Sequence, residues 1–206
     1  MKYSFSMGLV GRFLSGLVKK DIRESGLRKE ILKEYREILL RASDIGSRNK
    51  LLSSYLLAAF FIAMNRKDGL SPEENIKILE ERMRSSQALK LFMGNADNYF
   101  SEKNMASRRA WSRETLDPAH QKQYPNDWVV EVLPRTESYE FGFNYLQCGV
   151  CKLCRDEGCP ELSKFLCTLD YMLVEIMGLS LRRTQVLAEG APCCDFRFLR
   201  NEDPKA

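Results

Sequence analysis

The chain has 206 residues, 44% of them hydrophobic and 29% charged, which is ordinary for a soluble globular protein with a sizeable core. Its net charge of +4 is uneven, because residues 1–66 carry 13 Lys/Arg and 6 Asp/Glu while the remainder carries 19 and 22. No block of basic residues is longer than two, and stacking aromatics do not alternate with them. We therefore expect solvated helix faces and no nucleic-acid partner.

The first predicted helix spans residues 5–18, where Phe5, Leu9, Phe13 and Leu17 recur at i, i+4 spacing. Such an amphipathic helix either lies on a membrane surface or covers a core, and we expect it to cover a core. Its apolar run contains Arg12 and lacks a small-residue cleavage site, which argues against a secretory signal.

A second helix is predicted over residues 21–43, with Gly46 expected to end it. Its apolar positions follow helical spacing: Leu27, Ile31, Tyr35, Ile38 and Ala42. A third helix is predicted over residues 48–65. Because it is apolar nearly all round, we expect it to be central, and it is too short to span a bilayer.

A fourth helix is predicted after the turn at Asp68 and Gly69. Ser71 is placed to cap it, Pro72 suits the first helical position, and Glu74 can complete a capping box. We expect this helix to stop near Gly94.

After Gly94 the helical spacing of apolar residues becomes less regular. Residues 95–110 would add a helical turn or two, whereas the polar residues 112–127, with two prolines, predict a long loop. The lone His120 of this loop is expected at the surface. A Cys/His or Ser/His catalytic pair would have to use it, because the chain has no other histidine.

From Trp128 the apolar period changes to two. The aromatics of the second strand are expected on one face, and Gly178 should end the helix that follows. The predicted elements are strands at 128–133 and 139–147, a helix at 151–177, and a hairpin of strands at 181–188 and 194–199.

This order predicts an α+β fold, in which N-terminal helices pack on a small antiparallel sheet of β-β-α-β-β order. We expect a single domain over residues 1–206. Residues 1–110 form its mainly helical part, and residues 127–200 form the sheet and the long helix.

Seven cysteines lie between residues 148 and 194, and an odd number leaves at least one unpaired. We expect free thiols in a reducing cytoplasm. Cys148, Cys151, Cys154 and Cys159 come near the spacing of an iron–sulfur run, although the last gap is one residue too long. A metal or iron–sulfur site on these four thiols is therefore an alternative to a site without a cofactor.

A catalytic arrangement is also open. Cys167 and Asp170 lie three residues apart and share a helix face. They could divide nucleophilic and proton-transfer work, with Arg182, Arg183 and Arg197 of the predicted hairpin offsetting the carboxylate charge. The alternative is a buried Cys167 and an Asp170 that pairs with an arginine.

The last strand offers further candidates. Cys193 and Cys194 are adjacent, so they cannot easily face the same site, and one is expected in the core. Asp195 and Arg197 share a strand face, where they either bind a ligand carboxylate or form cross-strand ion pairs.

Together these residues resemble the L-2-amino-thiazoline-4-carboxylate hydrolase family. The match is closest over about residues 145–200. The positions that carry it are Cys148, Gly158, Pro160, Glu161, Leu162, Cys167, Asp170, Gly178, Arg183, Thr184, Leu187, Ala188, Gly190 and Cys194-Asp195-Phe196-Arg197. Those that look like additions are Cys151, Cys154, Cys159 and Cys193.

The resemblance implies hydrolysis of a cyclic amidine, in which the thiazoline ring opens to N-carbamoyl-cysteine. Such a reaction needs a nucleophile, a proton donor and a cation for the substrate carboxylate. Cys167 or an activated water would attack, Asp170 would act as acid/base, and Arg183 or Arg197 would hold the carboxylate. The expected catalytic residues are Cys148, Cys167 and Asp170, and the expected substrate-binding residues are Arg183, Cys194, Asp195 and Arg197.

The order of elements is also similar to that of vinyl-reductase-like small-molecule-binding domains, which supports a second hypothesis of ligand binding without turnover. Both hypotheses imply a small-molecule partner and no integral membrane segment. The oligomeric state stays open.

Overall fold

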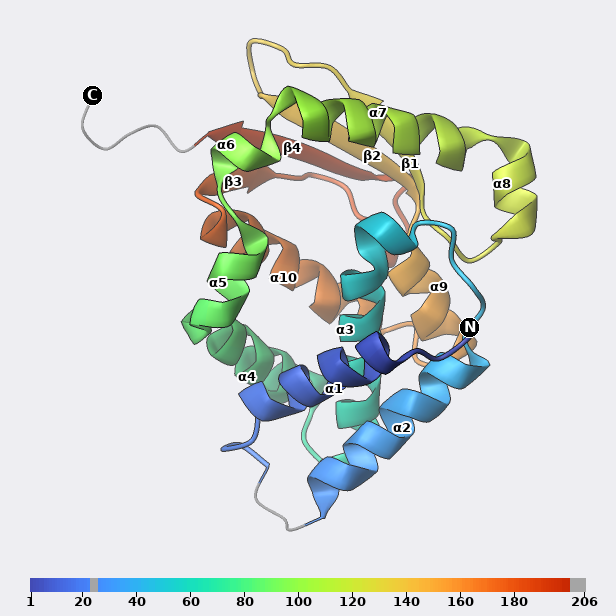
Figure 1. Cartoon of the computed structure of the whole chain (residues 1–206), viewed down its shortest axis with the longest axis vertical. Helices are drawn as coiled ribbons and strands as arrows, with labels where there is room; N and C mark the ends of the chain where they lie inside the picture. The colour runs from blue at the N-terminus through green and yellow to red at the C-terminus, as the bar shows by residue number, and fades with distance from the viewer. Residues whose placement is uncertain (23–25, 201–206) are drawn as a thin grey trace.

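The computed structural model describes residues 1–22 and 26–200, the side chains of Arg48 and Asn49 excepted. In that part of the chain, helices pack on a small antiparallel sheet (Figure 1), so the predicted α+β class is confirmed. The helices are α1 (Phe5–Leu17), α2 (Leu27–Arg41), α3 (Arg48–Lys67), α4 (Pro72–Ser85), α5 (Gln87–Met93), α6 (Ala96–Tyr99), α7 (Glu102–Leu116), α8 (Pro118–Gln123), α9 (Gly149–Asp156) and α10 (Leu162–Ile176). The strands are β1 (Val129–Leu133), β2 (Phe141–Gln147), β3 (Leu179–Arg182) and β4 (Cys194–Arg200).

The described strands pair in the order β1-β2-β4-β3, all antiparallel. In β2 and β4, Phe143 lies opposite Phe196 and Tyr145 lies opposite Cys194. Side chains alternate along a strand, so these residues share one face, which carries the core. The predicted aromatic face of β2 is confirmed, although Tyr139 precedes the strand and bridges Thr136 instead.

Helix α3 is the central helix that the sequence predicts. Tyr55, Leu56 and residues 58–64 are all buried. The helix contacts α1, α2, α4, α9 and α10 and stands among them in the middle of Figure 1. Buried hydrophobic residues of the described chain form one cluster from Met7 to Phe198. The single-domain organisation itself stays a prediction.

Helix α1 covers the core, but with the face opposite to the expected one. Phe5 is 78% exposed, whereas Met7 and Leu14 are buried. Gly11 explains the choice, because a Cβ there would lie 2.5 Å from the Tyr35 ring. The glycine lets Tyr35 reach the helix and donate a hydrogen bond from its hydroxyl to the Met7 carbonyl at 2.9 Å.

The predicted bounds of two helices need correction. Helix α2 covers residues 27–41 of the predicted 21–43, and residues 23–25 lie outside the described part. Gly46 does not cap it. It lies beyond the helix, where a Cβ would meet the His120 ring at 2.3 Å. The predicted fourth helix breaks at Ser86 into α4 and α5, with Gly94 (φ 73°) ending the second.

The capping box before α4 is confirmed. Ser71 Oγ accepts the Glu74 backbone N–H, and the Glu74 carboxylate accepts the Ser71 N–H at 2.9 Å. Pro72 occupies the first turn, as predicted.

The predicted loop at 112–127 is wrong, because α7 continues to Leu116 and α8 follows. Helix α7 lies along β1 (Figure 1), and hydrogen bonds of its hydroxyl groups join it to the strand. Ser112 Oγ donates to the Val130 carbonyl at 3.0 Å, and Thr115 Oγ1 accepts from the Val130 N–H at 3.2 Å. Polar contacts of this kind leave no apolar period in the sequence.

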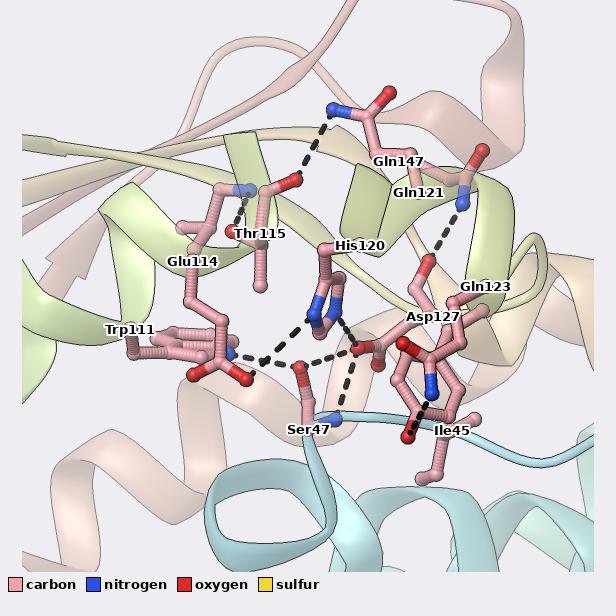
Figure 2. Close-up of polar contacts among 12 residues, drawn as sticks. Ile45, Ser47, Trp111, Glu114, Thr115, His120, Gln121, Gln123, Asp127 and Gln147 are labelled. Atoms are coloured by element: carbon pink, nitrogen blue, oxygen red, sulfur yellow. Dashed lines mark hydrogen bonds and ion pairs between the residues drawn. The ribbon is translucent and has the colours of Figure 1, made fainter. Parts of the chain in front are cut away.

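His120 is buried, which corrects the prediction of a surface position. Its Nε2 lies 2.8 Å from Asp127 Oδ2, and Asp127 is itself only 1% exposed. Figure 2 shows the two side chains facing each other. The same carboxylate oxygen accepts from the backbone N–H and the hydroxyl of Ser47, whose Oγ also accepts from Trp111 Nε1. The network joins the start of α3 to α7 and α8. The Ser47 hydroxyl donates to Asp127 and not to His120, so Ser47 and His120 do not form a catalytic dyad.

The single helix predicted over 151–177 is in fact α9 and α10. Gly158, with φ 72°, and Pro160 break it. Glu157 in the turn accepts hydrogen bonds from Arg41 Nη2 and Arg66 Nη1, both at 2.8 Å. This clasp holds the turn against α2 and α3. Gly178, with φ 76°, follows α10 as expected.

The predicted strand at 181–188 is also wrong, since β3 ends at Arg182. Asp195 on β4 accepts hydrogen bonds from the Thr184 N–H at 2.8 Å, the Thr184 hydroxyl at 2.7 Å and the Gln185 N–H at 2.6 Å. The ladder ends at Arg182, and these bonds hold the turn that begins directly after Arg183. No described helix has the length and hydropathy of a membrane span.

The buried network predicts a stability effect. His120→Ala should lower the free energy of unfolding by about 2–4 kcal/mol, because it leaves the buried Asp127 carboxylate short of a partner. Glu114→Gln is the matched control. Glu114 is 61% exposed and lies 3.5 Å from His120 Nδ1, so its loss should cost less than about 1 kcal/mol. Urea unfolding of both variants measures this, and equal losses would contradict the structural role of the network.

Candidate functional site

A cavity of about 110 Å³ lies between α3, α10 and the inner face of β2 and β4. One water needs about 10–15 Å³ of such space, so the cavity could hold several waters or one small ligand. Its chemically active lining residues are Cys148, Cys167, Asp170, Arg183 and Cys194. The other lining residues are Leu51, Ser54, Leu57, Trp128, Tyr145, Val150, Leu166, Leu169, Leu173 and Phe196.

The fold explains why five predicted site residues meet here. Cys148 directly follows β2, and Cys194 opens β4 opposite Tyr145. Cys167 and Asp170 lie on one face of α10, which packs against β3. Arg183 directly follows β3. Four separate segments therefore supply the polar wall.

Arg183 is the most confined charge in the cavity, with 4% of its side chain exposed. Its Nη1 donates to Asp170 Oδ2 at 2.7 Å, and its Nη2 donates to the Cys167 carbonyl at 2.9 Å. The guanidinium also lies over the rings of Tyr171 and Phe196 at 5.0 and 4.9 Å. Its buried Nε has no hydrogen-bond partner among the described residues. Arg183, which lines the cavity, thus keeps one donor nitrogen without a partner among the described residues.

The pKa of the Asp170 carboxyl is higher than that of an ordinary aspartate. Burial raises its pKa from 3.8 to about 6, although Arg183 acts in the opposite direction. About a third (34%) of the side chain remains exposed, so the carboxyl can exchange protons with solvent. A carboxyl with a pKa near 6 can take and return a proton near neutral pH.

The thiols of the cavity are held neutral. Burial, helped by the charge of Asp170, raises the pKa of Cys167 far above its ordinary value of 9. Burial also raises the pKa of Cys194 to about 11, and its sulfur accepts the Leu187 N–H at 3.2 Å. The pKa of Cys148 is raised well above 9 by hydrogen bonding to Cys151 and by burial. None of the three is an activated nucleophile in this state.

The other cysteines are arranged differently. A hydrogen bond with Cys148 lowers the pKa of Cys151 to about 7, with Ser163 and Arg155 acting in the same direction. Cys154 is buried, and burial raises the pKa of Cys159 to about 11. All seven cysteines are free. The described residues contain no group of three or more His, Cys, Asp or Glu arranged to hold a metal ion.

Asp195 and Arg197 do not line the cavity. They alternate with Cys194 and Phe196 along β4 and therefore lie on the outer face of the sheet. Arg197 donates to the carbonyls of Phe143 and Phe196 and to Asn144 Oδ1. Asp195 instead holds the turn that follows Arg183, so from the outer face of the sheet it helps to position a residue of the cavity.

Sequence reasoning missed the apolar part of the cavity. Leu51, Ser54 and Leu57 come from α3. The only sequence feature that pointed to a place for α3 beside a cavity was its apolar surface on all sides. Trp128 and Tyr145 gave no signal beyond strand periodicity. A larger hollow of about 700 Å³ over residues 135–140 is lined mostly by exposed side chains and none that is buried, so it offers no comparable chemistry.

Comparison with known families gives one finding. A family model described as L-2-amino-thiazoline-4-carboxylic acid hydrolase matches residues 49–198, which is more than half of the chain. This range includes every residue that lines the cavity. Comparisons with curated proteins and with solved structures find no match.

The relative pKa values of the cysteine thiols predict the order in which they react. Brief treatment with iodoacetamide at pH 7 should label Cys151 first, because its pKa of about 7 supplies the most thiolate. Cys167 should react at least about tenfold more slowly. Peptide mass spectrometry measures both. Faster labelling of Cys167 would contradict the neutral state assigned to the cavity thiols.

Proposed function

Because the chain belongs to the L-2-amino-thiazoline-4-carboxylic acid hydrolase family, we propose that its cavity hydrolyses a small cyclic amidine of the 2-amino-thiazoline-4-carboxylate type. In this reaction the oxygen of water bonds to the carbon between sulfur and nitrogen, and the carbon–sulfur bond breaks. One proton of the water goes to the leaving sulfur and the other to the ring nitrogen. The product is N-carbamoyl-cysteine.

The observation that carries the proposal is the unpartnered Nε of Arg183 in the cavity wall. A buried donor without a partner is costly, and a ligand carboxylate would satisfy it. Arg183 Nη1 and Nη2 already donate to Asp170 and to the Cys167 carbonyl, so the guanidinium is oriented before the ligand arrives. Arg197 lies on the outer face, and Arg183 is therefore the carboxylate clamp in this proposal.

The proposed nucleophile is water rather than Cys167. The raised pKa of Cys167 leaves almost no thiolate at neutral pH. Asp170 acts as the acid/base group. Its ionised form takes a proton from the attacking water, and its protonated form returns a proton to the leaving sulfur. A pKa of about 6 suits both steps.

The neutral thiols take a supporting role. Cys148, Cys167 and Cys194 form a polarisable wall for the ring sulfur without adding negative charge beside the substrate carboxylate. We place the reaction in the cytoplasm, which is consistent with seven free cysteines.

Asp170→Asn should lower kcat by roughly 10²–10⁴-fold, because it removes the acid/base group. For the unchanged protein, kcat/KM should fall about tenfold per pH unit below the Asp170 pKa of about 6, since protonation removes the base. Product formation followed by mass spectrometry across pH 4.5–8 measures this. A pH profile with no break near 6 would rule out Asp170 as the base.

Arg183→Lys should raise KM by about tenfold or more, because lysine keeps the charge beside Asp170 but loses the Nε donor. Arg197→Lys is the matched control on the outer face and should leave KM within about twofold. Equal effects of the two substitutions would contradict the clamp. Tight binding of the thiazoline without any product, in protein that is folded and reduced, would instead support the non-catalytic binding module.

A further inference from the structure

The start of α9 contains a cysteine pair that the proposed hydrolysis does not use as a pair. Cys148 is the N-cap of the helix, in extended conformation (φ −119°, ψ 120°), and Cys151 is the third helical residue. The Lys152 N–H donates to the Cys148 carbonyl at 3.1 Å, which closes the first turn between them. The segment is therefore a Cys-x-x-Cys sequence placed at a helix N-terminus.

This placement brings the two thiols together. The side chains of the N-cap and of the third helical residue face each other, which is why the capping box joins these same positions. Cα atoms at this spacing lie roughly 5–6 Å apart, within the range that a disulfide spans. Gly149 between them packs so closely on Trp128 that a Cβ would lie 2.7 Å from the ring, which fixes the backbone of the turn.

Cys154 is a poorer partner for Cys151, although it is also three residues away. Both residues lie inside the helix, where their Cα–Cβ bonds tilt in the same direction instead of converging. Cys154 is also buried, whereas Cys148 and Cys151 are only partly buried. The two half-buried thiols interact, and that interaction leaves Cys151 as the more acidic group, with a pKa of about 7.

We propose that Cys148 and Cys151 form a redox-active dithiol that exchanges with low-molecular-weight disulfides. The Cys151 thiolate attacks one sulfur of the external disulfide, whose S–S bond breaks and releases the first thiol. Cys148 then attacks Cys151 Sγ in the mixed disulfide, and the second external thiol leaves. Two protein thiols are oxidised, one external disulfide is reduced, and the two thiol protons pass to the two leaving thiolates.

The exchange has a consequence for the cavity. Cys148 lines it and Cys151 does not. The disulfide would draw the Cys148 sulfur toward Cys151 and change the wall beside Asp170, so hydrolysis should fall on oxidation. This last consequence rests on the proposed function, whereas the dithiol itself does not.

The tryptic map of the chain separates this pair from all other cysteines. Cleavage after Arg135 and Lys152 gives peptide 136–152, which holds Cys148 and Cys151 and no other cysteine. The full-length reduced protein is incubated with glutathione disulfide and then alkylated. We expect this peptide to lose two hydrogens, about 2 Da, to resist alkylation, and to recover both thiols with dithiothreitol.

Substitutions of single cysteines test the order of the two exchange steps. Cys148→Ser should trap a glutathione adduct on Cys151, because no resolving thiol remains. Cys193→Ser is the control, since that half-buried cysteine lies outside the cavity lining, and its peptide 136–152 should oxidise as in the unchanged protein.

Two results would overturn the inference: peptide 136–152 stays fully alkylated under glutathione disulfide, or it becomes linked to a peptide that contains another cysteine. The readout is a mass and needs no activity. The reduced protein can also be assayed for hydrolysis. If Cys148 and Cys151 oxidise as expected but the reduced protein does not hydrolyse the thiazoline, the dithiol is supported and the proposed function is contradicted.

Discussion

The architecture of the cavity depends on one buried charge, the guanidinium of Arg183. A buried cation is tolerated only when it is paired and hydrogen-bonded. Asp170 and the Cys167 carbonyl meet this requirement from α10, while Tyr171 and Phe196 cover the guanidinium faces. The pairing fixes the distance between α10 and the end of β3, and the Asp195 carboxylate holds the following turn from the opposite face of the sheet.

The same burial sets the protonation states. An environment that raises the pKa of Asp170 to about 6 also holds the Cys167 thiol neutral. A carboxyl that can exchange protons and a wall of uncharged thiols therefore share one cause. Cys151, at the first turn of α9 and outside the cavity lining, differs because its hydrogen bond with Cys148 lowers its pKa to about 7, with Ser163 and Arg155 acting in the same direction. We thus assign proton transfer to Asp170 in the cavity and thiol exchange to the pair of Cys148 and Cys151 at the start of α9. Cys148 links the two, because it lines the cavity and is also a member of the pair.

The sequence predicted the fold class, the central α3 and the capping box, because long apolar periods and capping residues act locally. It failed where packing is polar or depends on a close approach. Helix α7 is joined to β1 by hydrogen bonds of Ser112 and Thr115, which leave no apolar period in the sequence. Helix α1 packs with its Met7 and Leu14 face inward because Gly11 lets Tyr35 approach that face. His120 is buried because Asp127, seven residues away, meets it across a turn. The family resemblance named Cys148, Cys167, Asp170, Arg183 and Cys194 as site residues, but their meeting at one cavity is seen only in the structure. The separation of Arg197 from them depends on strand register.

The most direct test of the account is a crystal structure of the Asp170→Asn variant with the thiazoline substrate or N-carbamoyl-cysteine bound. We expect the ligand carboxylate to accept a hydrogen bond from Arg183 Nε, with the ring sulfur or product thiol against Cys148, Cys167 or Cys194. A ligand carboxylate bound to Arg197 on the outer face, or a ligand outside the cavity, would contradict it.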